Sequence, residues 1–495
     1  MIRDASKQPR LLVAIASYGH KNLPLLRQVI ASYREFTIDV HVVVLSEQPK
    51  QLGPGIEVIV GLPAKDPWSL PFAHKPLFAE RVNEYDLFVY SEDDVLFTER
   101  HLRAFVEATP QLQPDEIAGY LRYEVDGSGK RWIPTIHDHF HWKPESVRQR
   151  GPYTVAELTN EHSGFYLLTQ SQLNTALGSG GFLRAPYQSR YDMLCSAGTD
   201  PYTSCGFRKV LCISHMEDFL LHHLSNRYAG TLGMPVESLN QEIETLIDIG
   251  RGKHPATTLC QVESRMIGAR WSKSFYEPPN DLLIELVPRN AGTILSVGCG
   301  SGQTESRLVE RGAIVAALPL NSVVGASGAT RGVEMVYGDI DHGLTALSSR
   351  KFDCVIVSNL LHLFRNPGEV LQRCVRLLAP GGSFIASGPN FDGFKVMAKR
   401  FLRIGDYHRL SSFAESGITP CTPRTLKRYL DDEHLSIELV RWFSEDRPTD
   451  NLHPDRFPGR LTARNWLFRA RRVSRFADQP AAETQPPLVS SVNAV

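Results

Sequence analysis

The chain has 495 residues, more than one ordinary domain holds, so we expect two or three domains. A composition of 42% hydrophobic and 22% charged residues is typical of a soluble globular protein, and no apolar stretch reaches the length of about 18 residues that crosses a membrane. The formal net charge is zero and no signal-peptide pattern opens the chain, which argues against a nucleic-acid partner and predicts a cytoplasmic protein. Eight cysteines without a CxxC pair indicate reduced thiols rather than a zinc site.

The first half of the chain alternates apolar runs with segments of helix length, which predicts an α/β domain. Strands are expected at 11–16, 40–45, 56–60 and 86–90, and helices over 23–33 and 74–83. The first strand opens into a loop that begins Ser17-Tyr18-Gly19.

Three consecutive carboxylates, Glu92, Asp93 and Asp94, follow the fourth strand. At the end of a buried strand such groups repel one another and lose solvation, so they need a cation or strong hydrogen-bond donors. A divalent ion such as Mg²⁺ or Mn²⁺ would supply that charge and complete its coordination shell with substrate phosphates. The alternative is a solvated acidic turn that caps a helix beginning near Thr98.

Together with the loop after the first strand, this triplet makes residues 11–228 resemble the GT-A glycosyltransferases of the family 2 type. The resemblance implies that Asp94 and Glu92 hold the metal ion. It also implies a sugar-nucleotide site made by Ser17, Tyr18, Gly19, Glu92 and Asp93. The segment 161–165 would line the acceptor site.

A second acidic pair, Glu217 and Asp218, lies where inverting members of that family carry a catalytic carboxylate. Inverting transfer needs a base that takes the proton of the acceptor hydroxyl. The resemblance assigns this role to Asp218, with Glu217 as the second choice. The alternative is that both residues cap a helix over 219–226, on which His222 or His223 is either an extra metal ligand or part of a helix surface.

Histidines alternate in the segment His137-Asp138-His139-Phe140-His141, so they would share one face of an extended chain and could bind a metal. Stacking of this aromatic loop against a sugar is the other interpretation. Residues 231–272 are expected to form a helical connector.

The second half of the chain is organised around ILSVGCGSG at 294–302, an apolar run that opens into glycines and then into a helix over 303–311. Glycines let the backbone approach a nucleotide-like ligand, and the start of the helix offers free N–H groups. Strands at 314–318, 352–357 and 383–386, with a helix at 370–378, predict a doubly wound parallel sheet.

Four motifs in order make residues 273–442 resemble the class I S-adenosylmethionine-dependent methyltransferases: VGCGSG, YGDI, FDCVIVSNLLHLFRNP and LLAPGGSFIASGPN. The resemblance implies that the first motif contacts the methionine part of the cofactor and that the acidic residue of the second lies beside the adenine. The implied cofactor site consists of Gly298, Cys299, Gly300, Gly302, Asp339, Ile340, Ser358, Asn359 and His362.

One departure concerns the ribose of the cofactor. The family usually ends its second strand with an acidic residue, where this chain has Leu318 and Pro319. Neither side chain can bind two hydroxyl groups, so either Asn321 is the substitute or cofactor binding is weakened or lost. Tyr407 and His408 are the candidates for contacting a methyl acceptor.

The basic stretch 460–475 holds six arginines, no acidic residue and several aromatic residues. It predicts peripheral contact with the inner face of the plasma membrane or, alternatively, a solvated C-terminal helix. Residues 476–495 are rich in Pro, Ala, Ser and Gln, and we expect them to be disordered.

These patterns predict an α/β protein of two doubly wound domains, a GT-A-like domain at 1–230 and a Rossmann-like methyltransferase domain at 273–475. The expected function is a bifunctional transferase of surface polysaccharide biosynthesis. It would move a sugar from a sugar nucleotide to a glycan, free or lipid-linked, and methylate a glycan. One alternative is a methyltransferase with a non-catalytic sugar-binding module, and another is a scaffold that has lost both activities.

Overall fold

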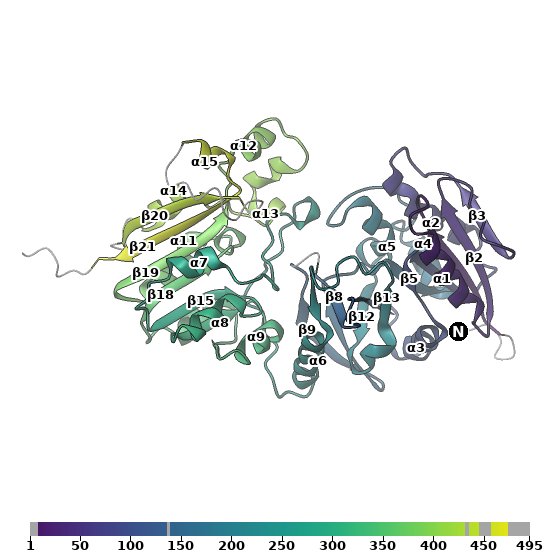
Figure 1. The fold of residues 1–495 in the computed structure, drawn as a ribbon, viewed down its shortest axis with the longest axis horizontal. Helices are drawn as coiled ribbons and strands as arrows, with labels where there is room; N and C mark the ends of the chain where they lie inside the picture. The colour runs from purple at the N-terminus through teal and green to yellow at the C-terminus, as the bar shows by residue number, and fades with distance from the viewer. Residues whose placement is uncertain (1–7, 136–138, 431–434, 445–456, 474–495) are drawn as a thin grey trace, which may run out of the picture.

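The computed structural model describes residues 8–135, 139–430, 435–444 and 457–473. Two α/β halves lie side by side along the long axis of the molecule (Figure 1). Within the described ranges, no helix combines the length and the apolar character needed to span a bilayer. The predicted tail at 476–495 and the residues His137 and Asp138 lie outside these ranges.

The N-terminal half is built on a five-stranded sheet in the order β11-β4-β1-β2-β3, in which only β11 is antiparallel to its neighbour. The predicted apolar runs form its parallel strands because strands buried on both faces are continuously apolar. The strands are β1 (Arg10–Ala16), β2 (Asp39–Ser46), β3 (Ile56–Val60), β4 (Leu87–Glu92) and β11 (Phe165–Thr169). The chain passes from β1 to β2 and β3 on one side and then to β4 on the other, so the strand order reverses between β1 and β4. Ligands of such sheets bind beyond the carboxyl ends of the strands at this reversal.

Short helices surround this sheet. They are α1 (Leu23–Arg34), η1 (Pro67–Ala73), α2 (His74–Glu80), α3 (Glu99–Ala108), η2 (Thr109–Gln111), α4 (Gln170–Gly178) and α5 (Met193–Thr203). The helix expected over 74–83 is thus shorter than predicted, and the one over 23–33 is confirmed.

Two smaller sheets, β6-β12-β10-β9 and β14-β8-β7-β13-β5, complete the N-terminal half. Their strands are β5 (Val95–Leu96), β6 (Glu116–Ala118), β7 (Leu121–Val125), β8 (Arg131–Pro134), β9 (Trp142–Arg150), β10 (Tyr153–Leu158), β12 (Arg208–Cys212), β13 (Leu220–His223) and β14 (Gly233–Pro235). Residues 220–223, expected in a helix by one interpretation, are therefore a strand that follows η3 (Ile213–Phe219). Because β13 pairs with β5, it places His223 opposite Val95, immediately after the acidic triplet.

The region expected to be a connector contains α6 (Val236–Gly250). This helix packs its apolar face into the N-terminal core through Val236, Leu239, Ile243 and Leu246. The chain then crosses to the C-terminal half through η4 (Ile267–Ala269).

The C-terminal half contains a seven-stranded sheet in the order β17-β16-β15-β18-β19-β21-β20. The first five strands are parallel, and the strand order reverses between β15 and β18. The strands are β15 (Thr293–Cys299), β16 (Ile314–Pro319), β17 (Glu334–Met335), β18 (Phe352–Ser358), β19 (Leu378–Pro389), β20 (Leu435–Phe443) and β21 (Asn465–Arg472). This arrangement confirms the predicted α/β fold.

The helical segments of this half follow the prediction for residues 303–311 and 370–378 within a few residues. They are α7 (Asp281–Leu286), α8 (Gln303–Glu310), α9 (Ser322–Ala329), α10 (Ile340–Ala346), η5 (Leu361–Leu363), α11 (Pro367–Arg376), α12 (Phe394–Phe401), η6 (Tyr407–Ser411), α13 (Phe413–Ser416), α14 (Pro423–Leu430) and α15 (Phe457–Thr462).

The basic stretch 460–475 requires a correction. Its residues 465–472 form β21, which lies between β19 and β20, and Trp466, Leu467 and Phe468 are at most 1% exposed. The aromatic side chains expected to meet a membrane are therefore part of the sheet core. The arginines of the strand are used as well, since Arg471 and Arg472 donate to backbone carbonyls of the neighbouring strand β19 and its turn.

The two halves are joined by specific contacts. The side-chain amide of Asn321, at the start of α9, donates to the carbonyl of Trp142 on β9 at 2.9 Å. The rings of His141 and Phe275 stack with their centroids 4.1 Å apart. The buried Glu242 of α6 accepts hydrogen bonds from Trp142 on one side and from Tyr276 on the other.

A buried ion pair between Lys75 of α2 and Asp200 of α5 holds two helices of the N-terminal half together, with side-chain exposures of 2% and 0%. Replacing Lys75 by Ala would leave a buried carboxylate without its cation, so we expect a loss of about 3 to 5 kcal/mol in the free energy of unfolding. Urea denaturation measures this loss. The exposed Lys65→Ala is the matched control and should unfold like the wild type, and an unchanged midpoint for Lys75→Ala would contradict the prediction.

Candidate functional site

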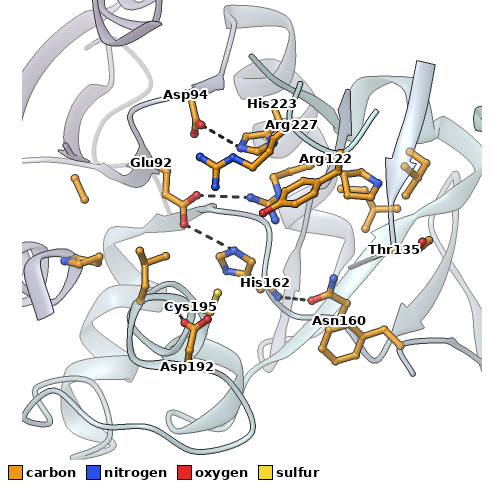
Figure 2. A pocket seen from close by; sticks show the side chains of 18 of the residues that line it. Glu92, Asp94, Arg122, Thr135, Asn160, His162, Asp192, Cys195, His223 and Arg227 are labelled. Carbon is orange, nitrogen blue, oxygen red and sulfur yellow. Dashed lines mark hydrogen bonds and ion pairs between the residues drawn. The ribbon is translucent and has the colours of Figure 1, made fainter. Parts of the chain in front are cut away.

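A cavity of about 450 Å³ opens at the carboxyl ends of β1 and β4, where the strand order of the N-terminal sheet reverses. Tyr18 and the complete triplet Glu92, Asp93 and Asp94 line it. The facing wall contains Arg122 of β7, Asn160 and His162 before β11, Asp192 and Cys195 at the start of α5, and His223, Arg227 and Tyr228 at and after β13 (Figure 2). Tyr276, from the segment that leads into the C-terminal half, also contributes to the wall.

Glu92 points toward an arginine and a histidine. Its carboxylate lies 3.6 Å from Nη1 of Arg122 and 3.8 Å from Nε2 of His162 (Figure 2). Burial raises the pKa of Glu92 to about 7, although the charge of Arg122 acts in the opposite direction. The group therefore changes its charge near neutral pH, where a proton acceptor is most useful.

Asp93 ties the end of β1 to the start of α1. It accepts hydrogen bonds from Ser17 Oγ at 2.7 Å and from Asn22 Nδ2 at 2.8 Å. Lys50 in turn donates to the carbonyl oxygens of Ser17 and Gly19. Burial raises the pKa of Asp93 while the two hydrogen bonds lower it, with a net increase.

Asp94 forms the first link of a buried chain of charges. Its carboxylate lies 3.1 Å from Nε2 of His223, and Nδ1 of the same ring donates to Glu124 at 2.6 Å. Burial alone would lower the pKa of His223, but the hydrogen bonds to Asp94 and Glu124 raise it above its ordinary value. Burial alone would likewise raise the pKa of Asp94, yet His223 holds it below its ordinary value. The pair is therefore best described as a carboxylate beside an imidazolium.

These partners decide how well the triplet fits a metal ion. The three carboxylates are directed to different groups: Glu92 to Arg122, Asp93 to Ser17 and Asn22, and Asp94 to His223. Across the described residues, no cluster of three or more His, Cys, Asp or Glu side chains is arranged to hold a metal ion. The expected Mg²⁺ or Mn²⁺ site at Asp94 and Glu92 therefore does not fit this arrangement, because protein cations already compensate the acidic charges.

The predicted sugar-nucleotide residues are only partly brought together. Tyr18 is 55% exposed and lines the cavity. Ser17 is buried and bound by Asp93 and Lys50, and Gly19 makes the turn with a φ of 65°. Their role is to shape the loop rather than to line the cavity.

The expected catalytic pair Asp218 and Glu217 needs a correction. Both residues lie on η3, and neither is part of the cavity wall. Asp218 is paired with Arg100 at 2.6 Å, and Glu217 forms a bidentate ion pair with Arg131 at 2.8 Å. Their acidic charge is thus satisfied at the surface.

The histidines next to this pair have separate roles. His222 stacks on Tyr123 on the face of the strand opposite to His223, and its Nε2 donates to Oδ1 of Asn226 at 3.1 Å. His223 reaches the cavity as the partner of Asp94. His162 belongs to the segment 161–165 that was expected to line the acceptor site, and it lines this cavity. Arg122 and Arg227 were not predicted, because single basic residues far apart in the chain leave no local pattern.

The glycine corner of the C-terminal half is located between β15 and α8, at the reversal of strand order. Gly298 and Gly302 have φ values of 82° and 77°, and Cys299 between them is buried. A Cβ atom on Gly300 would lie 2.5 Å from the carbonyl oxygen of Phe275, and one on Gly298 would lie 2.6 Å from Leu360. Close packing of the chain therefore demands glycine here, in addition to any demand from a ligand.

The other implied cofactor residues lie at the same sheet edge. Asp339 is exposed and caps α10, whose first residue is Ile340, by accepting from the amide of His342. Ser358 ends β18 and contacts Ser387 at 3.1 Å, and Asn359 follows with a φ of 49°.

Two of the implied cofactor residues have structural partners instead. His362 is buried, and its Nε2 lies 2.7 Å from the carbonyl oxygen of Trp271. Asn321 cannot substitute for the missing ribose acid, which corrects that expectation. Its Nδ2 donates to Trp142 and its Oδ1 accepts from Val324, so both ends of the amide are occupied at 2% exposure.

The segment 271–277 covers the glycine corner. The amide of Ser301 donates to the carbonyl of Phe275 at 2.9 Å, and the buried Lys273 is paired with Glu277. The proposed acceptor contacts lie beyond this segment: Tyr407 packs edge-on against Trp271, whereas His408 is exposed.

Comparisons with known proteins concern this half of the chain. Residues 279–410 match the family model of the methionine biosynthesis protein MetW. A ubiquinone biosynthesis O-methyltransferase of Xylella fastidiosa is 29% identical over 115 residues, which are 22% of this chain and 47% of that protein. The bifunctional methionine biosynthesis protein MetXA/MetW of Rhodopirellula baltica is 31% identical over 125 residues, which are 22% of this chain and 18% of that protein.

The chain thus spans less than half the length of these curated relatives. Among solved structures, the N-methyltransferase NodS of Bradyrhizobium japonicum in complex with S-adenosyl-l-homocysteine covers 37% of this chain and 78% of its own at 15% identity, with a TM-score of 0.26. An overlap this low adds nothing to the argument. The family match confirms that the C-terminal region resembles S-adenosylmethionine-dependent methyltransferases, and the resemblance of the N-terminal half to glycosyltransferases stays a prediction.

The raised pKa of Glu92 generates a prediction about stability. Because its folded pKa of about 7 lies above the ordinary value of 4.5, the folded state favours the protonated form. That contribution is fully present below pH 4.5 and is lost as the pH rises to 7. Glu92→Gln remains neutral, so relative to the wild type it should gain up to about 3 kcal/mol between pH 4.5 and pH 8.

Urea denaturation at both pH values measures this difference. The exposed surface variant Glu107→Gln is the control and should follow the wild type at each pH. A constant difference between Glu92→Gln and the wild type across this range would show that the pKa of Glu92 is the same in the folded and unfolded chains and would contradict the prediction.

Proposed function

We propose that this chain is an S-adenosylmethionine-dependent methyltransferase whose N-terminal half binds a sugar nucleotide. The first part rests on one observation: the family match and the expected ligand site of the sheet fall on the same residues. The stretch that matches the MetW family model, 279–410, contains the strand, glycine loop and helix start that meet at the reversal point of the C-terminal sheet. Doubly wound sheets bind their ligands at this point.

In this proposal the backbone N–H groups of the glycine corner hold the amino-acid end of the cofactor, and the exposed carboxylate of Asp339 accepts hydrogen bonds from the adenine. When bound, the cofactor supplies an electrophilic methyl group. The segment 271–277 keeps water away from the corner, and the fold orients the acceptor toward the methyl group. Because Leu318 and Pro319 offer the ribose no hydrogen-bond partner and Asn321 is occupied, we expect weaker cofactor binding than an acidic residue would give.

The second part of the proposal rests on the cavity of the N-terminal half. It lies at the reversal point between β1 and β4, and three cationic side chains reach it: Arg122, His223 and Arg227. A diphosphate carries negative charge that arginines bind with charge-assisted hydrogen bonds. Arg122 and His223 are already paired with Glu92 and Asp94, whereas Arg227 forms no ion pair with another described residue. We therefore propose that Arg227, rather than a divalent ion, supplies the positive charge that binds the diphosphate of a sugar nucleotide.

Glycosyl transfer to a glycan in surface polysaccharide biosynthesis is the finer form of this proposal. It requires a base inside the cavity, and Asp218 lies outside it. Glu92 is the better candidate, because its carboxylate lines the cavity and its pKa of about 7 suits proton transfer at neutral pH. A sugar-binding module without transfer activity is the alternative, and hydrolysis or transfer that is lost in Glu92→Gln would reject it.

Cofactor binding tests the first part. Isothermal titration calorimetry of the full chain with S-adenosylhomocysteine should show one site, and Asp339→Ala should weaken it about tenfold by removing a charged hydrogen-bond acceptor. The control Asp341→Ala, two residues further along α10, should bind like the wild type. Absence of binding by the wild type would overturn the methyltransferase proposal and would leave the sugar-nucleotide proposal standing.

Nucleotide binding tests the second part. In a panel of nucleoside diphosphate sugars, at least one should bind the full chain with equal affinity in the presence of Mn²⁺ and of EDTA. Arg227→Ala should weaken that binding about tenfold, since one charge-assisted contact is lost. The exposed Arg251→Ala, on the far end of α6, is the control. Binding that EDTA abolishes would contradict the cation-based site and favour a metal.

A further inference from the structure

Five exposed apolar side chains are gathered within residues 394–404, on α12 and in the turn that follows it. They are Phe394 (65% exposed), Met397 (43%), Phe401 (87%), Leu402 (62%) and Ile404 (49%). Single exposed apolar residues are normal on protein surfaces, but a contiguous group of large ones marks a surface that is covered in use.

The helix is attached to the domain by one side only. Val396 packs against the core of the C-terminal half, and Nζ of Lys399 lies 5.0 Å from the ring centroid of Tyr407. Phe394, Met397 and Phe401 are spaced three and four residues apart, so they share the opposite face. No residue of α12 is buried, and Figure 1 shows the helix at the upper edge of its half of the molecule.

Basic residues flank this apolar face. Residues 394–404 contain Lys395, Lys399, Arg400 and Arg403 and no acidic residue. Lys395, Arg400 and Arg403 are exposed, and the structure shows no ion pair between them and another described residue. An apolar face with a basic border is the signature of helices that lie in the interface of an anionic membrane.

We propose that α12 and its turn, residues 394–404, dock this protein peripherally on an anionic lipid surface. The apolar face would enter the boundary between headgroups and acyl chains, and the basic side chains would bind anionic headgroups. A second copy of the chain fits this surface poorly, because pairing two such helices would bring eight like charges together. A lipid surface supplies both the apolar medium and the opposite charge.

The position of α12 relates the docking surface to the proposed cofactor site. The helix follows the carboxyl end of β19, at the same edge of the sheet as the glycine corner. Docking through α12 therefore turns that edge toward the membrane. An acceptor embedded in lipid would then meet the proposed cofactor site, a consequence that rests on the proposed methyltransferase function, whereas the docking itself does not.

Vesicle cosedimentation of the full chain tests the docking. Vesicles of phosphatidylcholine with about one third phosphatidylglycerol should bind the wild type, vesicles of phosphatidylcholine alone should not, and added salt should weaken the binding. Phe401→Ser should lower the partition coefficient about tenfold, because a large apolar side chain no longer enters the interface. The combined variant Lys395→Gln, Arg400→Gln, Arg403→Gln should lower it about 100-fold, since each basic side chain contributes about fivefold.

Matched controls come from exposed residues elsewhere on the chain. Leu183→Ser removes an apolar side chain that is 55% exposed, and the combination Lys253→Gln, Arg289→Gln, Arg331→Gln removes three exposed positive charges. Both should bind anionic vesicles like the wild type. All substituted positions are exposed, so the melting temperatures should stay unchanged.

Three results would overturn the proposal. One is a wild type that does not bind anionic vesicles. Another is binding that both α12 variants retain in full. The third is a dimer that dissociates on Phe401→Ser in analytical ultracentrifugation without any vesicle binding, which would identify the surface as a protein interface.

Discussion

Three adjacent carboxylates buried at the end of β4 constrain the whole N-terminal half. Each carboxylate must find compensation, and the fold supplies it from a different direction: Arg122 from β7, Ser17 and Asn22 from the loop between β1 and α1, and His223 from β13. The pairing of β13 with β5 brings the ring of His223 next to Asp94. The same convergence leaves a cavity in which the acidic triplet faces the basic side chains of Arg122, His223 and Arg227.

The C-terminal half also has a mostly parallel sheet, and its glycine corner lies where the strand order reverses. Its glycine corner is packed from outside by the backbone of Phe275, which belongs to the segment between the two halves. The next residue, Tyr276, lines the N-terminal cavity and contacts Glu242. Phe275 therefore touches one proposed site and its neighbour Tyr276 touches the other. A ligand that moves this segment in one site would also move a residue of the other site. This link gives a physical reason for joining two sites in one chain.

The central strands were predictable because their pattern is local. Strands buried on both faces of a parallel sheet are continuous apolar runs, and Leu11 to Ala16 or Ile294 to Val297 can be recognised without any partner. The acidic triplet and the glycine corner were also predictable, since each follows such a run directly.

Long-range pairing was not predictable in the same way. Glu217 and Asp218 were predicted to be catalytic, but each is paired with an arginine far away in the sequence. The partner of Glu217 is Arg131, 86 residues away, and the partner of Asp218 is Arg100, 118 residues away. Asn321 looked like a ribose ligand until the carbonyl of Trp142, 179 residues away, occupied it. The arginines and aromatic residues of β21 were interpreted as a membrane-facing stretch. The sequence does not reveal that these arginines donate hydrogen bonds to backbone carbonyls of β19.

Hydrogen–deuterium exchange of the full chain tests most directly whether the protein has two distinct ligand sites. S-adenosylhomocysteine should slow amide exchange at 298–302 and 339–342, and a bound sugar nucleotide should slow it at 17–19, 92–95 and 223–228. Protection at the first set with the first ligand and at the second set with the second is the predicted result. Protection of the same set by both ligands, or of neither set by either ligand, would contradict the account.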